Sequence, residues 1–174
     1  KLIKSKDKMK QKIFEYYTQS VLEQEKEPTS VYRFCKDLKI GEDEFYNHFA
    51  SLEDLRRKIF SEFFNNSLSL IEKEKGYVSK SPKEKLLSFY FTFFEVLLIN
   101  RSYVLIALRG DKSSINKMAI LKFLRSSFKK FAIVLIQDGN ALKQSRLSRH
   151  SETVFSEGAW IQLLFLLKFW MEDS

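Results

Sequence analysis

The sequence predicts an all-helical fold, and three observations support this prediction. Glycine and proline are scarce, with five and two residues in a chain of 174. Apolar residues recur at the spacing of helix faces. No strand-like alternation bounded by turn residues occurs. A chain of this length can bury one sizeable core or two small ones.

The first predicted elements lie in residues 29–55. An apolar stripe covers two helical turns, at Val31, Phe34, Cys35 and Leu38. The stripe breaks at Lys39-Ile40-Gly41, where we expect Gly41 to supply the positive φ of a sharp corner. A second stripe follows at Phe45, Tyr46 and Phe49, and Ser51 with Asp54 forms a cap pattern for a third, longer helix. The pattern predicts a helix-turn-helix, whose second helix can lie in a DNA major groove.

The remaining helices are bounded by cap and corner residues. Residues 52–75 are expected to form one helix that ends at Gly76, and Ser81-Pro82 begins the next. A corner at 100–102 leads into a short helix through Leu108, which Gly110-Asp111 ends. A long helix runs from about Ser114 to Asp138-Gly139, and residues 140–150 are a polar, basic loop or a frayed turn. The last helix begins near Ser151 and carries Trp160, Leu163, Leu164, Leu167 and Trp170.

The helix-turn-helix segment resembles the tetracycline-repressor (TetR) family of bacterial one-component transcription factors, over about residues 13–60. Thr29-Ser30 matches the cap of the family's second helix, Phe34-Cys35 its Ile-Ala core positions, and Ile40 its turn Val. Phe45-Tyr46-x-His48-Phe49 is similar to the family signature Leu-Tyr-x-His/Tyr-Phe. Ser51-x-Glu53-x-Leu55 is similar to its continuation Ser-Lys-Glu-x-Leu. The resemblance implies a helix-turn-helix DNA-binding domain over 1–55 and a helical effector-binding and dimerisation domain over 56–174.

The same resemblance implies which residues meet DNA: Thr29, Ser30, Arg33, Lys39, Glu42, Glu44, Tyr46, Asn47 and His48. We expect Tyr46 and His48 to face the DNA backbone and Phe45 and Phe49 to be buried. Two departures from the family concern DNA. Acidic residues 42–44 replace small or basic ones at the head of the recognition helix, and Leu52 replaces a Lys. The acids suit a helix N-terminus and repel phosphates, although a carboxylate can also accept from a cytosine amino group.

Charge is unevenly distributed along the chain. The whole chain carries a net charge of +8, which suits a polyanionic partner. Residues 1–12 hold six Lys and one Asp, residues 13–60 hold seven basic and ten acidic residues, and residues 61–174 hold seventeen basic and eleven acidic residues. Phosphate contacts would therefore come from the basic residues in and before the helix-turn-helix: Lys4, Lys6, Lys8, Lys10, Lys12, Arg33, Lys36 and Lys39.

A ligand site is expected in the C-terminal domain, because pockets between bundle helices are usual ligand sites. The chain holds seventeen Phe, seven Tyr and two Trp, which serve either a core or an aromatic pocket. The polar residues best placed to orient a small, largely apolar effector are Tyr90, Asn100, Arg101, Tyr103, Arg109 and Gln137.

The sequence gives little support to catalysis. Two His residues and one Cys supply neither a catalytic triad nor a structural zinc site, and no Gly-rich phosphate loop occurs. We therefore predict no enzyme activity, metal or cofactor. The single Cys suits a reducing cytoplasm. The sequence contains no uncharged stretch of about 18 apolar residues, so we expect no membrane span.

These observations predict a TetR-like regulator that binds operator DNA as a homodimer through its last two long helices, about 114–138 and 151–172. A small molecule would bind better when the two DNA-binding domains of the dimer have one spacing than when they have another, and would so shift operator affinity. Two alternatives stay open. One is a TetR-like ligand- or partner-binding dimer with weakened or lost DNA binding, and the other is a soluble carrier of hydrophobic molecules.

Overall fold

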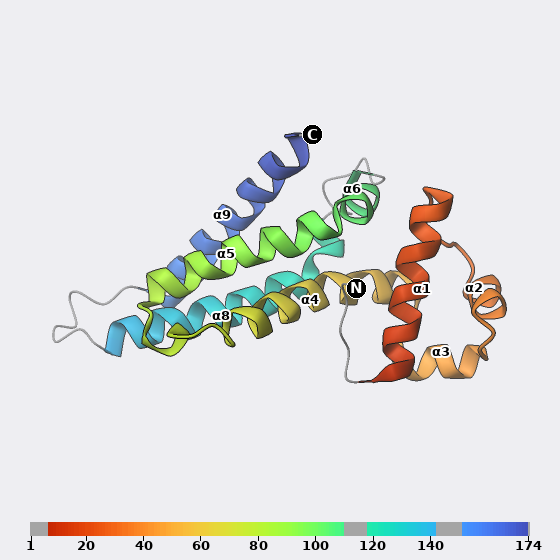
Figure 1. Cartoon of the computed structure of the whole chain (residues 1–174), viewed down its shortest axis with the longest axis horizontal. Helices are drawn as coiled ribbons and strands as arrows, with labels where there is room; N and C mark the ends of the chain where they lie inside the picture. The colour runs from red at the N-terminus through yellow and green to blue at the C-terminus, as the bar shows by residue number, and fades with distance from the viewer. Residues whose placement is uncertain (1–6, 110–117, 142–150, 174) are drawn as a thin grey trace. The chain divides into compact units, whose positions relative to one another are not determined.

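The computed structural model describes residues 7–109, 118–141 and 151–173, and in these residues regular secondary structure is helical throughout. The elements are α1 (Lys8–Gln24), α2 (Val31–Leu38), α3 (Glu42–His48), α4 (Leu52–Ile71), the 3-10 turn η1 (Tyr77–Ser79), α5 (Pro82–Ile99), α6 (Arg101–Arg109), α8 (Lys122–Ala141) and α9 (Glu152–Glu172) (Figure 1). The predicted fold class is confirmed.

Contacts divide the chain into two compact units. The first holds residues 1–66 and 96–124, and the second holds residues 67–95 and 125–174. Helix α4 is continuous from Leu52 to Ile71, so the predicted domain boundary after residue 55 falls within its first turn. Each unit is described below by itself.

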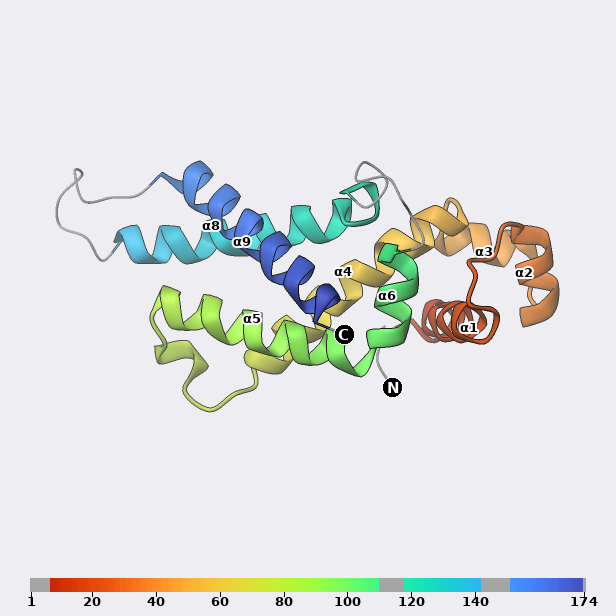
Figure 2. The ribbon, with the colours of Figure 1, turned by 90° about the horizontal axis from the view of Figure 1, so that it is seen from above.

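The first unit is built around α1, with α2 and α3 beside it (Figures 1 and 2). Helix α1 begins at Asp7, whose Oδ1 accepts hydrogen bonds from the backbone N–H groups of Met9 and Lys10 at 2.9 and 3.2 Å. Its inner face is apolar, with Ile13, Phe14, Tyr17 and Val21 buried. Helix α6 also packs in this unit, where the Tyr103 ring lies against Phe60 and Phe63 of α4.

The corner between α2 and α3 differs from the sequence prediction. Ser30 caps α2, since its Oγ accepts from the backbone N–H of Arg33 at 3.3 Å. The left-handed residue is Lys39, with φ 58°, whereas Gly41 has φ −72° and caps α3. Two backbone hydrogen bonds close the end of α2, from Lys39 to Lys36 and from Ile40 to Cys35. The expectation that Gly41 supplies the positive φ is therefore wrong.

Two predicted helix ends also shift. Helix α4 ends at Ile71, and Gly76, with φ 84°, follows a separate turn and opens η1. Helix α8 does not stop at Asp138-Gly139 but continues to Ala141. Gly139 packs closely there, because a Cβ at that position would lie 3.4 Å from the Pro82 ring. The predicted start near Ser114 and the break at Gly110-Asp111 lie outside the described residues. The starts of α5 at Pro82 and of α9 after Ser151 are confirmed.

The second unit is a bundle of α5, α8 and α9 held by aromatic side chains. Phe128 of α8 lies 5.5 Å from Phe89 of α5 and 6.1 Å from Trp160 of α9, measured between ring centroids. The Tyr90 hydroxyl donates to the Ala159 carbonyl oxygen at 2.9 Å. These contacts tie all three helices together.

Helix α9 is long and apolar enough to cross a membrane by length and composition alone. Its Trp160, Leu163 and Leu167 side chains are buried in the bundle, and 28% of its apolar 18-residue window is buried. A core helix of a soluble protein passes the same test, so this property is weak evidence for a membrane span.

Candidate functional site

The recognition helix α3 is held in the first unit by an aromatic core. Phe45 and Phe49 are fully buried, as predicted. The Phe49 ring centroid lies 5.2 Å from that of Phe14 on α1, and the Phe45 centroid lies 5.8 Å from that of Phe34 on α2. Aromatic pairs at these distances add to the free energy of area burial. The backbone of α3 is therefore fixed against both preceding helices.

The opposite face of α3 is exposed. Tyr46 is 52% exposed, and Asn47 and Glu42 also lie in solvent, while Glu44 is half-buried. The predicted basic residues Arg33 and Lys39 are exposed on α2 and at the corner after it. Thr29 is exposed just before α2, and the Ser30 hydroxyl accepts the hydrogen bond that caps this helix. The structure thus brings the predicted DNA-binding residues together on the helix-turn-helix.

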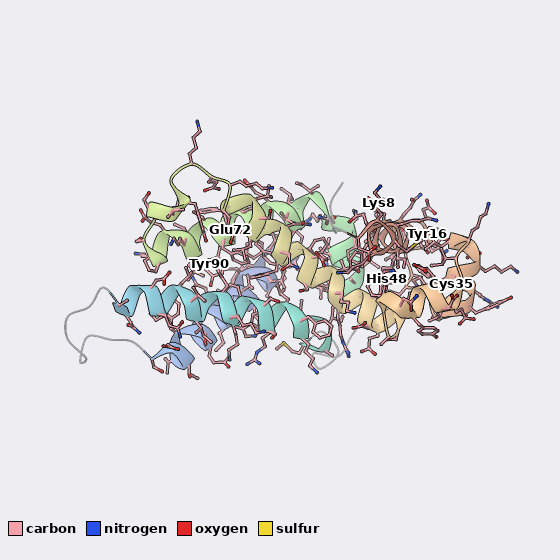
Figure 3. The ribbon with its side chains drawn as sticks, turned by 90° about the horizontal axis from the view of Figure 1, so that it is seen from below. Lys8, Tyr16, Cys35, His48, Glu72 and Tyr90 are labelled. Atoms are coloured by element: carbon pink, nitrogen blue, oxygen red, sulfur yellow. The ribbon has the colours of Figure 1, made fainter. Side chains whose placement is uncertain are left out.

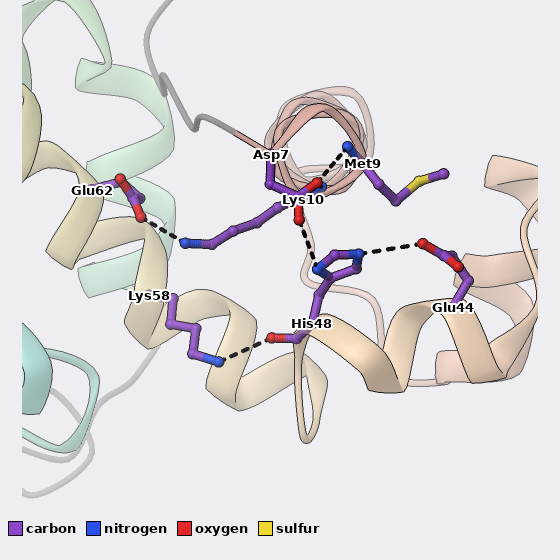
Figure 4. A network of polar contacts seen from close by, with 7 residues as sticks. All are labelled: Asp7, Met9, Lys10, Glu44, His48, Lys58 and Glu62. Atoms are coloured by element: carbon purple, nitrogen blue, oxygen red, sulfur yellow. Dashed lines mark hydrogen bonds and ion pairs between the residues drawn. The ribbon is translucent and has the colours of Figure 1, made fainter.

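His48 differs from the other predicted DNA contacts because its ring is half-buried between two carboxylates (Figure 4). Its Nε2 lies 3.3 Å from Glu44 Oε1, and its Nδ1 lies 3.5 Å from Asp7 Oδ2. The Lys58 ammonium donates to the His48 carbonyl oxygen at 3.0 Å. Each ring nitrogen thus has a carboxylate oxygen of the protein within 3.5 Å.

Asp7 is the site residue that sequence reasoning missed. The backbone N–H of Lys10 holds the pKa of the Asp7 carboxyl below its usual value, with smaller contributions from Met9 and His48. A cap at the start of α1 could have been found in the sequence, since Asp is a preferred N-cap. Its approach to His48 could not, because that contact depends on how α1 packs on α3.

The lysines that the sequence predicts to contact phosphate in α1, in α2 and before α1 divide into three groups. Lys8, Lys12 and Lys36 are exposed. Lys10 is held within the unit, because its ammonium forms an ion pair with Glu62 at 2.9 Å. Lys4 and Lys6 lie outside the described residues. Of the lysines expected to contact phosphate, Lys10 therefore already has an acidic partner within the protein.

A groove of about 530 Å³ lies in the first unit, between α1 and the corner that joins α5 to α6. Three of the predicted ligand residues line it: Asn100, Arg101 and Tyr103. Exposed Leu22, Leu98 and Ile99 supply its apolar wall. A volume of this size falls in the range of small-molecule pockets.

Comparisons with known proteins concern the C-terminal half of the chain and the fold as a whole. The family model "Tetracyclin repressor-like, C-terminal domain" matches residues 85–174, which is just over half of the chain. The chain belongs to the TetR family. Members of this family are transcription regulators and not enzymes.

A solved structure shows the same fold. The chain matches the crystal structure, at 2.10 Å resolution, of a protein assigned as a TetR family transcription regulator from Shewanella sp. PV-4. The TM-score is 0.57 at 17% sequence identity, and the match covers 96% of this chain and 87% of the other. No curated protein matches the sequence.

The other predicted ligand residues of this TetR protein do not join the groove. Tyr90 is buried in the second unit (Figure 3), where burial raises the pKa of its hydroxyl to about 12. Gln137 is exposed and donates to the Glu152 carboxylate at 3.0 Å, and Arg109 is exposed at the end of α6. Asn100, which does line the groove, is largely buried and donates to the Val96 carbonyl oxygen at 2.7 Å. The six residues therefore do not form one site.

Tyr103 is placed to connect three helices of the first unit. Its ring is 2% exposed and lies 6.4 Å from the Tyr17 ring of α1, in addition to its contacts with α4. Burial raises the pKa of its hydroxyl well above the usual value, and the hydroxyl has no hydrogen-bond partner among the described residues. Glu27 and Arg56, which form an ion pair, lie near enough to act on the same hydroxyl electrostatically.

Proposed function

We propose that this TetR-family regulator binds operator DNA as a homodimer through α3 and is controlled by a small, largely apolar effector. The observation that supports DNA binding best is the division of α3 into two faces. Phe45 and Phe49 fix the helix in the core, while Tyr46 and Asn47 project into solvent. A recognition helix needs such an anchored inner face and a polar outer face. A regulator of this kind acts in the cytoplasm.

The dimer proposal is supported by an apolar surface on α9. Ile161, Phe165 and Phe169 are 63%, 59% and 55% exposed and recur at intervals of four residues. Val154 extends this α9 stripe by seven residues toward the N-terminus. Apolar patches of this kind on a soluble protein mark interaction sites. A symmetric pair of such stripes would bury both.

The structure changes which α9 residues are expected at the dimer interface. Leu163 and Leu167 are buried within the bundle, and Leu164 and Trp170 are half-buried. From the sequence we expect exposed parts of all four at that interface, because they would otherwise leave a large apolar patch on a monomer. The helix is apolar on more than one face, so periodicity alone could not separate the inner face from the outer one.

The effector proposal is supported by the groove beside α6. Asn100, Arg101 and Tyr103 line it together with the exposed aliphatic side chains of Leu22, Leu98 and Ile99. A ligand there would touch α1 of the helix-turn-helix unit, so its binding could favour one arrangement of that unit over another.

A second function is favoured by the charge of α3. Glu42, Asp43 and Glu44 lie in its first turn, and the first two are exposed. Such a helix repels phosphates, which supports a TetR-like dimer that binds a ligand or protein partner but has weak or no DNA binding.

Titration against genomic and random duplexes at two salt concentrations separates these functions. For a DNA-binding regulator we expect selective binding to some genomic fragments that weakens steeply with salt. Tyr46→Phe, which removes one exposed hydroxyl, should weaken that binding without changing the melting temperature. Replacing Glu42 and Glu44 with Gln should strengthen binding to every duplex if the acids act by repulsion. No detectable wild-type binding at low salt would favour the second function.

A further inference from the structure

The His48 side chain is held by groups from two different helices. Glu44, one turn earlier on α3, contacts Nε2, and Asp7, the cap of α1, contacts Nδ1. Figure 4 shows the ring lying between these two carboxylates. Neither nitrogen is left to meet a DNA phosphate while both contacts last.

Asp7 performs two tasks with its two carboxylate oxygens. Oδ1 accepts the backbone hydrogen bonds that start α1, and Oδ2 faces the His48 ring. The cap fixes the carboxylate in place, so the contact to His48 costs little additional side-chain entropy. The position of α1 thereby determines one partner of a residue on the recognition helix.

Two lysines lie near this cluster, and Lys10 acts electrostatically on the Asp7 carboxylate. On α4, Lys58 forms an ion pair with Asp54 at 2.9 Å and donates to the His48 carbonyl oxygen. On α1, Lys10 forms an ion pair with Glu62. Two carboxylates thus face one imidazole, and the local charge is unfavourable to a phosphate.

We propose that Asp7 and Glu44 hold the His48 side chain away from the DNA backbone and so weaken binding to arbitrary duplex DNA. The inference rests on the proposed function, because it concerns how the helix-turn-helix meets a phosphate. Asp7 is a positioning residue here, and the contact with phosphate, once released, belongs to His48.

Asp7→Ser is the variant that tests this most directly. Serine is also a preferred N-cap, so α1 keeps its start. Its side chain is shorter and uncharged, so it does not hold the ring. Freeing His48 Nδ1 for one phosphate should raise affinity for random duplex about five- to tenfold at about 0.1 M salt.

The comparison with His48→Ala separates this effect from a general change in charge. In the His48→Ala background, Asp7→Ser should raise affinity much less than it does in the wild-type background. Asp43→Asn is the matched control, because it removes one exposed charge from α3 at a residue next to Glu44. Its effect should be equal in both backgrounds.

Three results would overturn the inference, and they are distinguishable. If wild type binds DNA but Asp7→Ser leaves affinity unchanged or lowers it, the inference fails and the proposed function stands. The same holds if the gain persists undiminished in His48→Ala. If no variant binds random duplex at low salt, the proposed function fails as well. The melting temperatures of wild type, Asp7→Ser, His48→Ala and the double variant, measured without DNA, would then show whether Asp7 and His48 are coupled only in stability.

Discussion

The helix-turn-helix unit and the α5–α8–α9 bundle use aromatic residues in different ways. In α2 and α3 the aromatic core residues point inward, and their solvent faces are mostly polar. The bundle buries some of its aromatic rings, but it leaves other large apolar side chains exposed. These are Leu87, Phe91, Val134, Val154, Ile161, Phe165 and Phe169. A helix that is apolar all round is usually covered on both sides. The comparison indicates that the helix-turn-helix buries its aromatic core within the first unit, whereas the bundle leaves apolar surface that the proposed dimer would cover.

The largest expected effect tests the first half of this comparison. Phe49→Ala should destabilise the first unit by about 3–5 kcal/mol, because it truncates a fully buried aromatic ring that contacts Phe14 and Phe45. Chemical denaturation followed by circular dichroism measures the change. Tyr46→Ala, on the exposed face of the same helix, is the control and should cost far less. A loss below about 1 kcal/mol for Phe49→Ala would contradict a closed aromatic core.

The next effect tests the second half. Phe165→Glu places a charge in the centre of the α9 stripe and should weaken the dimer by about 2 kcal/mol or more, which is roughly a thirtyfold increase in Kd. Light scattering across a concentration series measures it. Phe91→Glu is the matched control, since Phe91 is 66% exposed on α5 and Phe165 is 59% exposed on α9. A dimer that is lost with Phe91→Glu and kept with Phe165→Glu would place the interface on α5 instead.

These two regions also differ in how well the sequence predicts them. Several predictions depend on residues close together in the chain, and the structure agrees with them: the stripe of α2 with its Ser30 cap, the burial of Phe45 and Phe49, and the starts of α5 at Pro82 and of α9 near Ser151. On α9 the inner and outer faces have similar composition, so only packing distinguishes Leu163 from Phe165. The left-handed Lys39 also escaped prediction, because a nearby glycine offered the conformation at lower intrinsic cost.

The candidate site shows the same limit. Helical period places Phe45 and Phe49 on one face of α3, and the family resemblance places Tyr46 toward DNA. The contact between Asp7 and His48 and the ion pair of Lys10 with Glu62 depend on tertiary packing. A signature of local spacing does not contain that information.

A pH-dependent effect is expected where α8 meets α9. A hydrogen bond from Lys129, supported by Arg125, holds the pKa of the Glu157 carboxyl below its ordinary value of 4.5. The folded state therefore binds this proton less readily than the unfolded state, so the stabilisation is present above about pH 4.5 and lost as the pH falls through the lower folded value.

Glu157→Gln should accordingly lower the melting temperature at about pH 7, and the difference from wild type should shrink toward about pH 3. Glu95→Gln, at an exposed position on α5, is the control. Thermal melts of the three proteins across this pH range measure the effect. A difference that stays constant down to about pH 3 would show that charge on Glu157 is not its source.

The smallest expected effect concerns the Tyr103 hydroxyl, which is buried without a hydrogen-bond partner among the described residues. Tyr103→Phe keeps the ring against Tyr17, Phe60 and Phe63 and removes only this oxygen. A buried polar group without a partner is unfavourable, so the substitution should leave the free energy of unfolding unchanged or raise it by up to about 1 kcal/mol. Tyr17→Phe removes the hydroxyl of the neighbouring ring and is the control that shows whether a change is particular to Tyr103. Denaturation measures both variants. A loss of more than about 1 kcal/mol for Tyr103→Phe would show that the hydroxyl is satisfied in solution, and a water bridging it to the nearby Glu27–Arg56 pair would then be the simplest cause.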